Sequence, residues 1–286
     1  VADDLHRKDR SVLAPVMHLD IDARAFPQFP PQLAPGFRTQ IGVELPDMHF
    51  DQFVPAVAEA LAGGVAGGAT AATRARRCNE TARIIIYEKD GYASFANCGL
   101  PYYLGGEITD RNKLLVAKPE TFRDRYKIEL CTRHEVTRVD TEKREVEVLD
   151  RDAGKTFTQS YDRLILAPGA APIVPPIEGA TAPNVFTLRN MEDTDRIFAF
   201  LGEAKPKRAV VIGAGFIGLE MAEQLQHRGC EVAVVELAPQ VLPPLDPEMA
   251  AFIAEELQAK GIALHTGDGV KGFTLTGDRT TGVVLN

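Results

Sequence analysis

Cys98 has the strongest potential for chemistry in this chain because of the sequence around it. It lies within Ser94-Phe95-Ala96-Asn97-Cys98-Gly99-Leu100-Pro101-Tyr102-Tyr103, where a proline soon after the cysteine suits the first turn of a helix. Amide donors at a helix N-terminus stabilise a thiolate, which is the reactive form of cysteine. Since no CxxxxC pair is present, this thiolate would pair with an external thiol or cycle through a sulfenate. The alternative is a buried, inert cysteine.

A glycine-rich turn follows much later in the chain, as Gly213-Ala214-Gly215-Phe216-Ile217-Gly218. An apolar strand precedes it and a helix follows, which is the context that gives G-x-G-x-x-G its meaning as a dinucleotide site. Gly213 permits the tight turn, Gly215 lets a pyrophosphate approach the backbone, and Gly218 brings helix and strand close. The alternative is a turn that serves packing alone.

An acid lies where the ribose of such a nucleotide would be bound. Glu236 ends the next predicted strand, and an acid there accepts hydrogen bonds from a ribose 2′-hydroxyl. Its charge would repel a 2′-phosphate, and Leu237-Ala238-Pro239-Gln240 offers no arginine. The sequence therefore predicts NADH in preference to NADPH.

A first glycine turn precedes Cys98, as Gly63-Gly64-Val65-Ala66-Gly67-Gly68, with Val65 in the middle glycine position. Glu88 follows after a strand, about 20 residues on, as a ribose-binding acid should. The approach to the turn, residues 54–62, favours helix over strand by propensity. We therefore expect the central strand of this first domain to be absent or poorly formed.

This order of residues resembles the flavin-dependent pyridine nucleotide-disulfide oxidoreductases, and within them the coenzyme A-disulfide reductases with their NADH oxidase and persulfide reductase relatives. The resemblance covers roughly Leu61 to Asn286, and this family tolerates the substitution at Val65. It implies FAD at the first turn and NADH at the second. The implied FAD contacts are Gly63, Gly64, Ala66, Gly67, Gly68, Glu88, Lys89, Asn97, Val136, Ala167, Pro168 and Gly169. The implied NADH contacts are Gly213, Gly215, Phe216, Ile217, Gly218 and Glu236.

The resemblance also implies a substrate. Coenzyme A contacts in that family match Thr70, Arg77, Ser94 and Asn97, and Arg74 lies one turn before Arg77 on the same helix face. The alternative for the two arginines is a solvated basic face. The implied activity is electron transfer from NADH through FAD to a CoA-type disulfide or persulfide at catalytic Cys98, in an enzyme that is a homodimer at full length. An NADH oxidase of the same family, and an inactive fragment or NAD-binding remnant, are the alternatives.

The wider pattern predicts an α/β fold with two Rossmann-like dinucleotide-binding domains. Strands and helices alternate from Leu61 onward, which implies parallel sheets, and three period-2 segments after His134 predict an antiparallel meander. We expect a proline-rich, poorly ordered extension over residues 1–56. An FAD-binding domain with the meander is expected over 57–175 and an incomplete NAD(H)-binding domain over 184–286. We also expect the extension to be dispensable for the fold of the rest.

Composition narrows the remaining possibilities. The net charge of −8 argues against nucleic acid and anionic membranes as partners. No apolar run reaches the ~18 residues of a membrane span, and the first residues do not read as a secretory signal. The four cysteines are scattered, which favours a reducing cytoplasm. The histidines are scattered too, and we assign no metal site.

Overall fold

The computed structural model describes residues 11–15 and 58–286, which divide into two compact units. Of the described residues, one unit comprises 58–89 and 119–170, and we call it the first nucleotide unit. The other comprises residues 11–15, 90–118 and 171–286, and we call it the second nucleotide unit.

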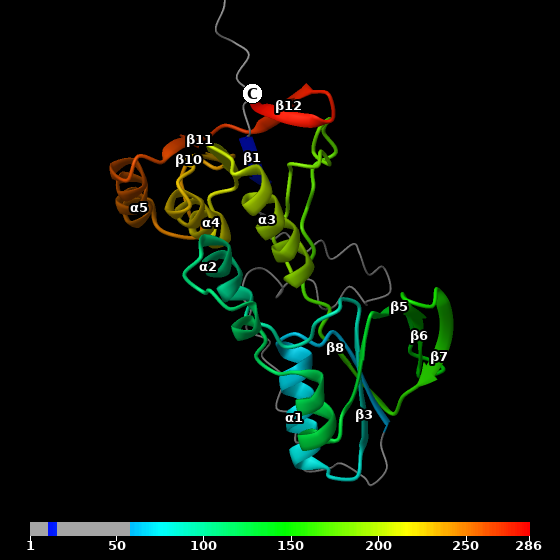
Figure 1. Cartoon of the computed structure of the whole chain (residues 1–286). Helices are drawn as coiled ribbons and strands as arrows, with labels where there is room; N and C mark the ends of the chain where they lie inside the picture. Colours follow the sequence, from blue (N-terminus) through cyan, green and yellow to red (C-terminus); the bar gives the residue numbers. More distant parts are fainter. Residues whose placement is uncertain (1–10, 16–57) are drawn as a thin grey trace, which may run out of the picture. The chain divides into compact units, whose positions relative to one another are not determined.

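The first nucleotide unit contains a parallel four-stranded sheet in the order β4-β3-β2-β8 (Figure 1). Its elements are β2 (Ala58–Ala62), α1 (Gly67–Cys78), β3 (Arg83–Glu88), a π-helical turn (Thr121–Arg125), β4 (Glu129–Thr132) and β8 (Arg163–Leu166). An antiparallel meander is formed by β5 (His134–Asp140), β6 (Glu145–Asp150) and β7 (Lys155–Ser160). Buried Ile85, Tyr87, Val146 and Val148 join the meander to the sheet.

The expectation of a missing central strand is wrong. Residues 58–62 form β2, which is hydrogen-bonded on both sides, to β3 with Leu61 opposite Ile86 and to β8 with Leu61 opposite Ile165. Helix propensity amounts to a few tenths of a kcal/mol per residue, and two strands rich in isoleucine and leucine offer a complete set of backbone partners. Pairing with both neighbours therefore determines the conformation of this alanine-rich segment.

The second nucleotide unit contains the parallel sheet β1-β9-β10-β11 and a separate antiparallel hairpin, β12-β13. Its strands are β1 (Ser11–Pro15), β9 (Arg208–Ile212), β10 (Glu231–Glu236), β11 (Ala263–Thr266), β12 (Val270–Thr276) and β13 (Arg279–Leu285). Its helices are α2 (Leu100–Gly105), α3 (Met191–Ala204), α4 (Phe216–His227) and α5 (Pro247–Ala259), with 3₁₀ turns at Asn97–Gly99 and Arg111–Leu114.

The predicted fold class, an α/β chain with two Rossmann-like units, is confirmed by this architecture. The predicted domain boundaries stay a prediction. The sequence pattern did not predict the hairpin β12-β13 or the strand β1, which pairs in parallel with β9 from Ser11 opposite Arg208 to Pro15 opposite Ile212. That residues 1–56 are dispensable for the fold of the rest stays a prediction. The rest of the predicted extension up to residue 56 lies outside the described residues.

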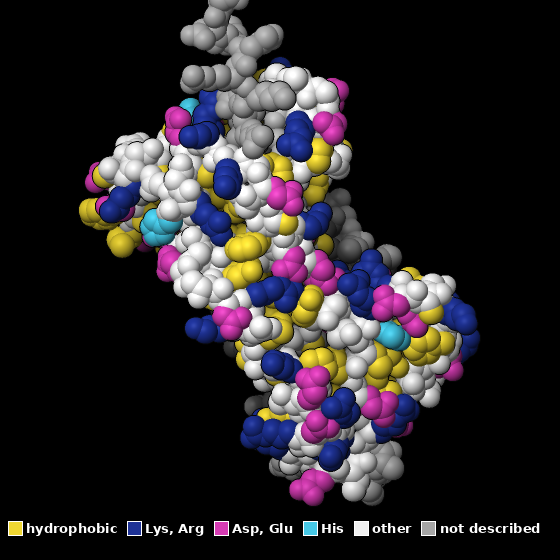
Figure 2. Space-filling view, viewed as in Figure 1, with side chains coloured by type: hydrophobic (Ala, Val, Ile, Leu, Met, Phe, Trp, Pro, Cys, Tyr) yellow, Lys and Arg dark blue, Asp and Glu magenta, His cyan; other side chains and the backbone are white. Residues whose placement is uncertain are grey.

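Charges of both signs are interspersed on the face drawn in Figure 2. Within the described part of the chain, no helix is both long and apolar enough to cross a membrane. Nor do the side chains of residues 11–15 and 58–286 include a cluster of three or more His, Cys, Asp or Glu arranged to hold a metal ion.

Candidate functional site

The two glycine turns, each within its own unit, share the roles of their first and last glycines. The first glycine has a left-handed backbone, with φ of 100° at Gly63 and 98° at Gly213. The last glycine packs directly on the first: a Cβ at Gly68 would lie 1.7 Å from the Gly63 carbonyl oxygen, and one at Gly218 would lie 2.0 Å from that of Gly213. These positions therefore need glycine for the fold itself.

The middle position of the motif, unlike the first and the last, does not need glycine for packing. A Cβ at Gly215 would meet no described atom within 4 Å, so the protein's own packing does not require glycine there. Val65 occupies the corresponding place in the first turn, and that turn is formed all the same. The N-cap residues of the two helices, Ala66 and Gly215, have no side-chain oxygen, which leaves the first N–H groups of α1 and α4 available to an anion.

An acid at the end of the neighbouring strand supports each turn. The Glu88 carboxylate accepts a 2.7 Å hydrogen bond from the backbone N–H of Gly64, and the Glu236 carboxylate accepts one of 2.7 Å from Ala214. The other carboxylate oxygen of Glu236 accepts a 2.7 Å hydrogen bond from the backbone N–H of Ala238. Both acids are buried, and a carboxylate oxygen has a second lone pair for a ribose hydroxyl. The residues therefore fit a dinucleotide at either turn.

The structure brings several predicted FAD residues together in the first nucleotide unit. A Cβ at Gly63 would lie 2.0 Å from the Ala167 carbonyl oxygen, so the segment Ala167-Pro168-Gly169 runs against the glycine turn. Val136 lies on β5, packed against the core that contains Tyr87. The segment 167–169 therefore lies at the glycine turn, whereas Val136 lies on the meander side of the core.

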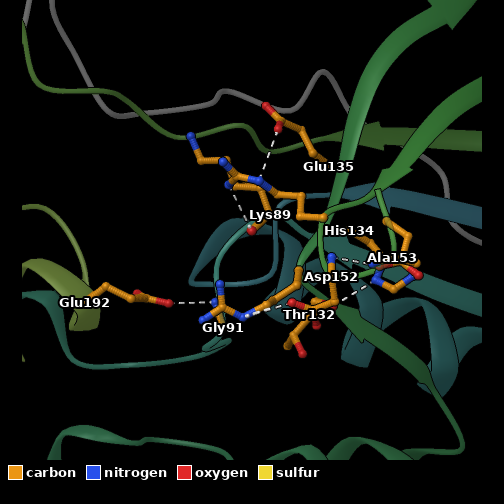
Figure 3. Close-up of polar contacts among 11 residues, drawn as sticks. Lys89, Gly91, Thr132, His134, Glu135, Asp152, Ala153 and Glu192 are labelled. Carbon is orange, nitrogen blue, oxygen red and sulfur yellow. Dashed lines mark hydrogen bonds and ion pairs between the residues drawn. The ribbon is translucent and has the colours of Figure 1, made fainter. Parts of the chain in front are cut away.

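Lys89 follows Glu88 at the end of β3, and Arg151 holds its backbone. The Arg151 guanidinium donates to the Lys89 carbonyl oxygen at 3.3 Å and lies 3.7 Å from the Glu135 carboxylate; Figure 3 labels Lys89 and Glu135, the two partners. The same view shows, in the second nucleotide unit, the Gly91 N–H donating to Glu192 at 2.8 Å. The backbones of Lys89 and Gly91 are thus each hydrogen-bonded by a side chain of their own unit.

Cys98 lies in the second nucleotide unit, exposed, in the 3₁₀ turn that leads directly into α2. Asn97 beside it is exposed, and its Oδ1 accepts from Arg189 at 3.4 Å. Ser94 has a left-handed backbone, with φ of 51°, and its carbonyl oxygen accepts from Val116 and Ala117. The alternative to a reactive Cys98 was a buried, inert cysteine, and its burial is wrong because Cys98 is exposed. The reactivity of Cys98 stays a prediction.

The other cysteines are less accessible. Cys78 and Cys131 are half-buried, and Cys230 is buried with its thiol donating to the Pro206 carbonyl oxygen at 3.4 Å. Burial raises the pKa of both Cys131 and Cys230. Protonated thiols of this kind are poor nucleophiles.

The candidate CoA residues divide between the units. Thr70, Arg74 and Arg77 lie on exposed positions of α1 in the first nucleotide unit. Ser94 and Asn97 lie in the second. Arg76, between the two candidate arginines in sequence, has a structural role instead, because it donates to the carbonyl oxygens of Tyr126, Lys127 and Glu80.

Sequence reasoning missed the residues that hold α2. Arg228 Nε donates to the Leu104 carbonyl oxygen at 2.7 Å, and Gln224 Nε2 donates to the Glu107 carboxylate at 2.8 Å. Arg228-Gly229 gave only the signal of a helix end, and Gln224 stands at a buried position of α4 where the pattern predicts an apolar residue. The latter mismatch is the one sign that could have drawn attention to it.

Two Rossmann-like units, each with a glycine turn and a buried acid, together with an exposed cysteine define a dinucleotide-dependent redox protein by fold. The chain belongs to the pyridine nucleotide-disulphide oxidoreductase family, whose model matches residues 60–286. Membership in this family implies binding of FAD and of a pyridine nucleotide.

Similar proteins narrow the comparison. The chain is 41% identical over 207 residues to the coenzyme A disulfide reductase of Staphylococcus epidermidis, a match that covers 71% of this chain and 45% of that protein. Among solved structures, the crystal structure of reduced Bacillus anthracis CoADR-RHD has 44% sequence identity to this chain. The TM-score is 0.76, and the match covers 81% of this chain and 43% of that one. A NAD-dependent persulfide reductase from A. fulgidus is 35% identical, with a TM-score of 0.75 over 80% and 43%. The chain thus spans about half the length of these relatives.

Proposed function

We propose that this chain belongs to an enzyme that transfers electrons from NADH through FAD to a disulfide or persulfide of the coenzyme A type, with Cys98 as the catalytic residue. The observation that carries the proposal is the pair of glycine turns with buried acids, joined in one chain to an exposed cysteine. The 41% identity to a coenzyme A disulfide reductase supports the choice of substrate class.

The chain's own residues would hold the two cofactors. The turn Gly63–Gly68, the N-terminus of α1, Glu88, Lys89, Val136 and the segment 167–169 would bind FAD. The turn Gly213–Gly218 with Phe216 and Ile217, together with Glu236, would bind NADH. FAD, when bound, takes two electrons from the nicotinamide and passes them to sulfur.

Cys98 would perform the sulfur chemistry. Its thiolate would attack one sulfur of the substrate disulfide, release the first half as a thiolate and form a mixed disulfide with the other half. Two electrons then break that bond and regenerate the Cys98 thiolate, and two protons complete the two thiol products. Asn97 and Ser94, beside Cys98, and Thr70, Arg74 and Arg77 on α1 would contact the CoA portion, where arginine can bind phosphate bidentately. We expect the full-length protein to be a cytoplasmic homodimer.

Glu236 carries the preference for NADH. Replacing it with glutamine keeps an acceptor for the turn but removes the charge that opposes a 2′-phosphate. We expect Glu236→Gln to narrow the gap between NADH and NADPH affinity by about 1–2 kcal/mol, the order of one like-charge contact. Fluorescence titration with both nucleotides measures this, and tighter NADPH binding by the unaltered chain would refute the assignment.

The proposal is tested with the purified chain and with a longer form that matches the length of its relatives. Stoichiometric flavin absorbance and its bleaching by NADH without oxygen are the expected results. In the longer form, Cys98→Ser should abolish thiol release from CoA disulfide and leave flavin reduction intact, since the first half-reaction needs no thiol. If Cys98→Ser kept both thiol release and flavin reduction, electrons would leave by another route. Oxygen consumption that Cys98→Ser does not change would point to oxygen as the acceptor.

A further inference from the structure

The helix after Cys98 is packed on the helix that begins at the second glycine turn. Helix α2 contacts both α4 and α3, all within the second nucleotide unit (Figure 1). The contact is close: a Cβ at Gly105, in the last turn of α2, would lie 1.7 Å from Gln224 Oε1. The six residues of α2 are too few for a helix that is stable by itself, so its position depends on these neighbours.

Arg228 holds the C-terminal end of α2. Its Nε donates to the Leu104 carbonyl oxygen at 2.7 Å, one of the carbonyl groups that a helix end leaves without an intrahelical partner. Its guanidinium also lies over the Phe198 ring, 5.2 Å from the centroid, and Phe198 is stacked on Tyr103 of α2 at 4.8 Å. The Arg228 side chain, at the C-cap of α4, therefore contacts α2 directly. It also contacts Phe198 of α3, which itself packs on α2.

Gln224 holds the same helix from one turn earlier. It is 1% exposed, and its Nε2 donates to Glu107 Oε1 at 2.8 Å, just beyond α2. His227 Nδ1 lies 3.5 Å from the same Glu107 oxygen. Gln224 Oε1 is buried and has no hydrogen-bond partner among the described residues. A buried amide with one unsatisfied atom costs stability, which packing alone does not explain, since leucine would fill the same space.

We propose that Arg228 and Gln224 are positioning residues for Cys98, which couple nucleotide binding at the second glycine turn to the placement of α2. This inference rests on the proposed function, because it takes NADH as the ligand of that turn. A nucleotide bound at the N-terminus of α4 orders that end of the helix, and a continuous helix carries the order to its last two turns. There Gln224 and Arg228 transmit it to α2, whose first residue is two positions after Cys98.

Hydrogen exchange of the whole chain tests the coupling. NADH should slow exchange of the amides of residues 100 and 102–105 by fivefold or more, along with those in the first turn of α4. Arg228→Ala should abolish the effect in α2 and preserve it in α4. Arg228→Lys, which keeps a donor for Leu104, should restore part of it, and Gln224→Leu should weaken it. Lys260→Ala is the matched control, because Lys260 is likewise a cation at a helix C-cap, on α5.

The comparison with and without NADH separates positioning from mere structure, since a residue that only stabilises α2 would change exchange equally in both states. The rate of alkylation of Cys98 should likewise change threefold or more when NADH is added to the unaltered chain, and it should not change in Arg228→Ala. Protection of α4 without protection of α2, or full protection of α2 in Arg228→Ala, overturns the coupling alone. If NADH protects neither helix, the nucleotide assignment fails and the coupling fails with it.

Discussion

At the scale of single residues, the second glycine turn separates a requirement of the fold from a requirement of the ligand. Gly218→Ala would place a Cβ 2.0 Å from the Gly213 carbonyl oxygen, so we expect a loss of about 1–3 kcal/mol in the free energy of unfolding. Gly215→Ala meets no described atom within 4 Å, so we expect a change within about 0.5 kcal/mol but weaker nucleotide binding. Urea unfolding and NADH titration measure the two effects, and equal destabilisation by both changes would contradict this division.

Tyr87 gives the first nucleotide unit a dependence on alkaline pH. Burial, followed by the nearby Cys131, raises the pKa of this phenol from 10.0 to about 12. A pKa raised in the folded state favours the protonated form, so its contribution is complete below pH 10 and is lost as the pH rises through about 12. Two pKa units correspond to roughly 2–3 kcal/mol. Tyr87→Phe should remove this contribution, and denaturant unfolding at pH 9 and near pH 12 would show it; parallel losses in both proteins would argue against it.

At the scale of elements, β1 is a described part of the N-terminal region, and it pairs with a sheet strand. Removing residues 1–15 leaves the edge of β9 without the partner that runs from Ser11 to Pro15. We expect a loss of about 1–3 kcal/mol, because a few backbone hydrogen bonds at about 0.5–1.5 kcal/mol each are lost. Removing residues 1–10 retains β1 and is the control. Equal thermal stability of the two shortened chains would show that β1 contributes nothing.

The elements also show what a sequence can and cannot predict here. Both glycine turns with their acids follow local rules of spacing, so the amino-acid sequence by itself predicts the places of Gly213, Gly218, Glu88 and Glu236. It does not predict the strand β2, because the conformation of that segment depends on β3 and β8 on either side. The arrangement of Gln224 and Arg228 against α2 likewise depends on how two helices pack, and the identity of these two residues does not predict that packing.

At the scale of the whole molecule, the chain does not complete one unit before it begins the other. The second nucleotide unit is assembled from three separate stretches of sequence, and the first lies between them in two. Cys98 belongs to the middle stretch of the second unit, while the predicted FAD turn belongs to the first. The residues proposed to bind FAD and the proposed catalytic cysteine therefore belong to different units.

The pairing of β1 with β9 also fixes an order of events during synthesis. Ser11 lies opposite Arg208, so β1 must wait for a strand that lies much later in the chain. At about 5–20 residues per second, β1 leaves the ribosome roughly 10–40 s before its partner. During that interval its backbone N–H and C=O groups are satisfied by water or by other segments. The sheet that carries the second glycine turn is therefore completed only after β9 has been made, and residues 11–15 reach their place in it well after their own synthesis.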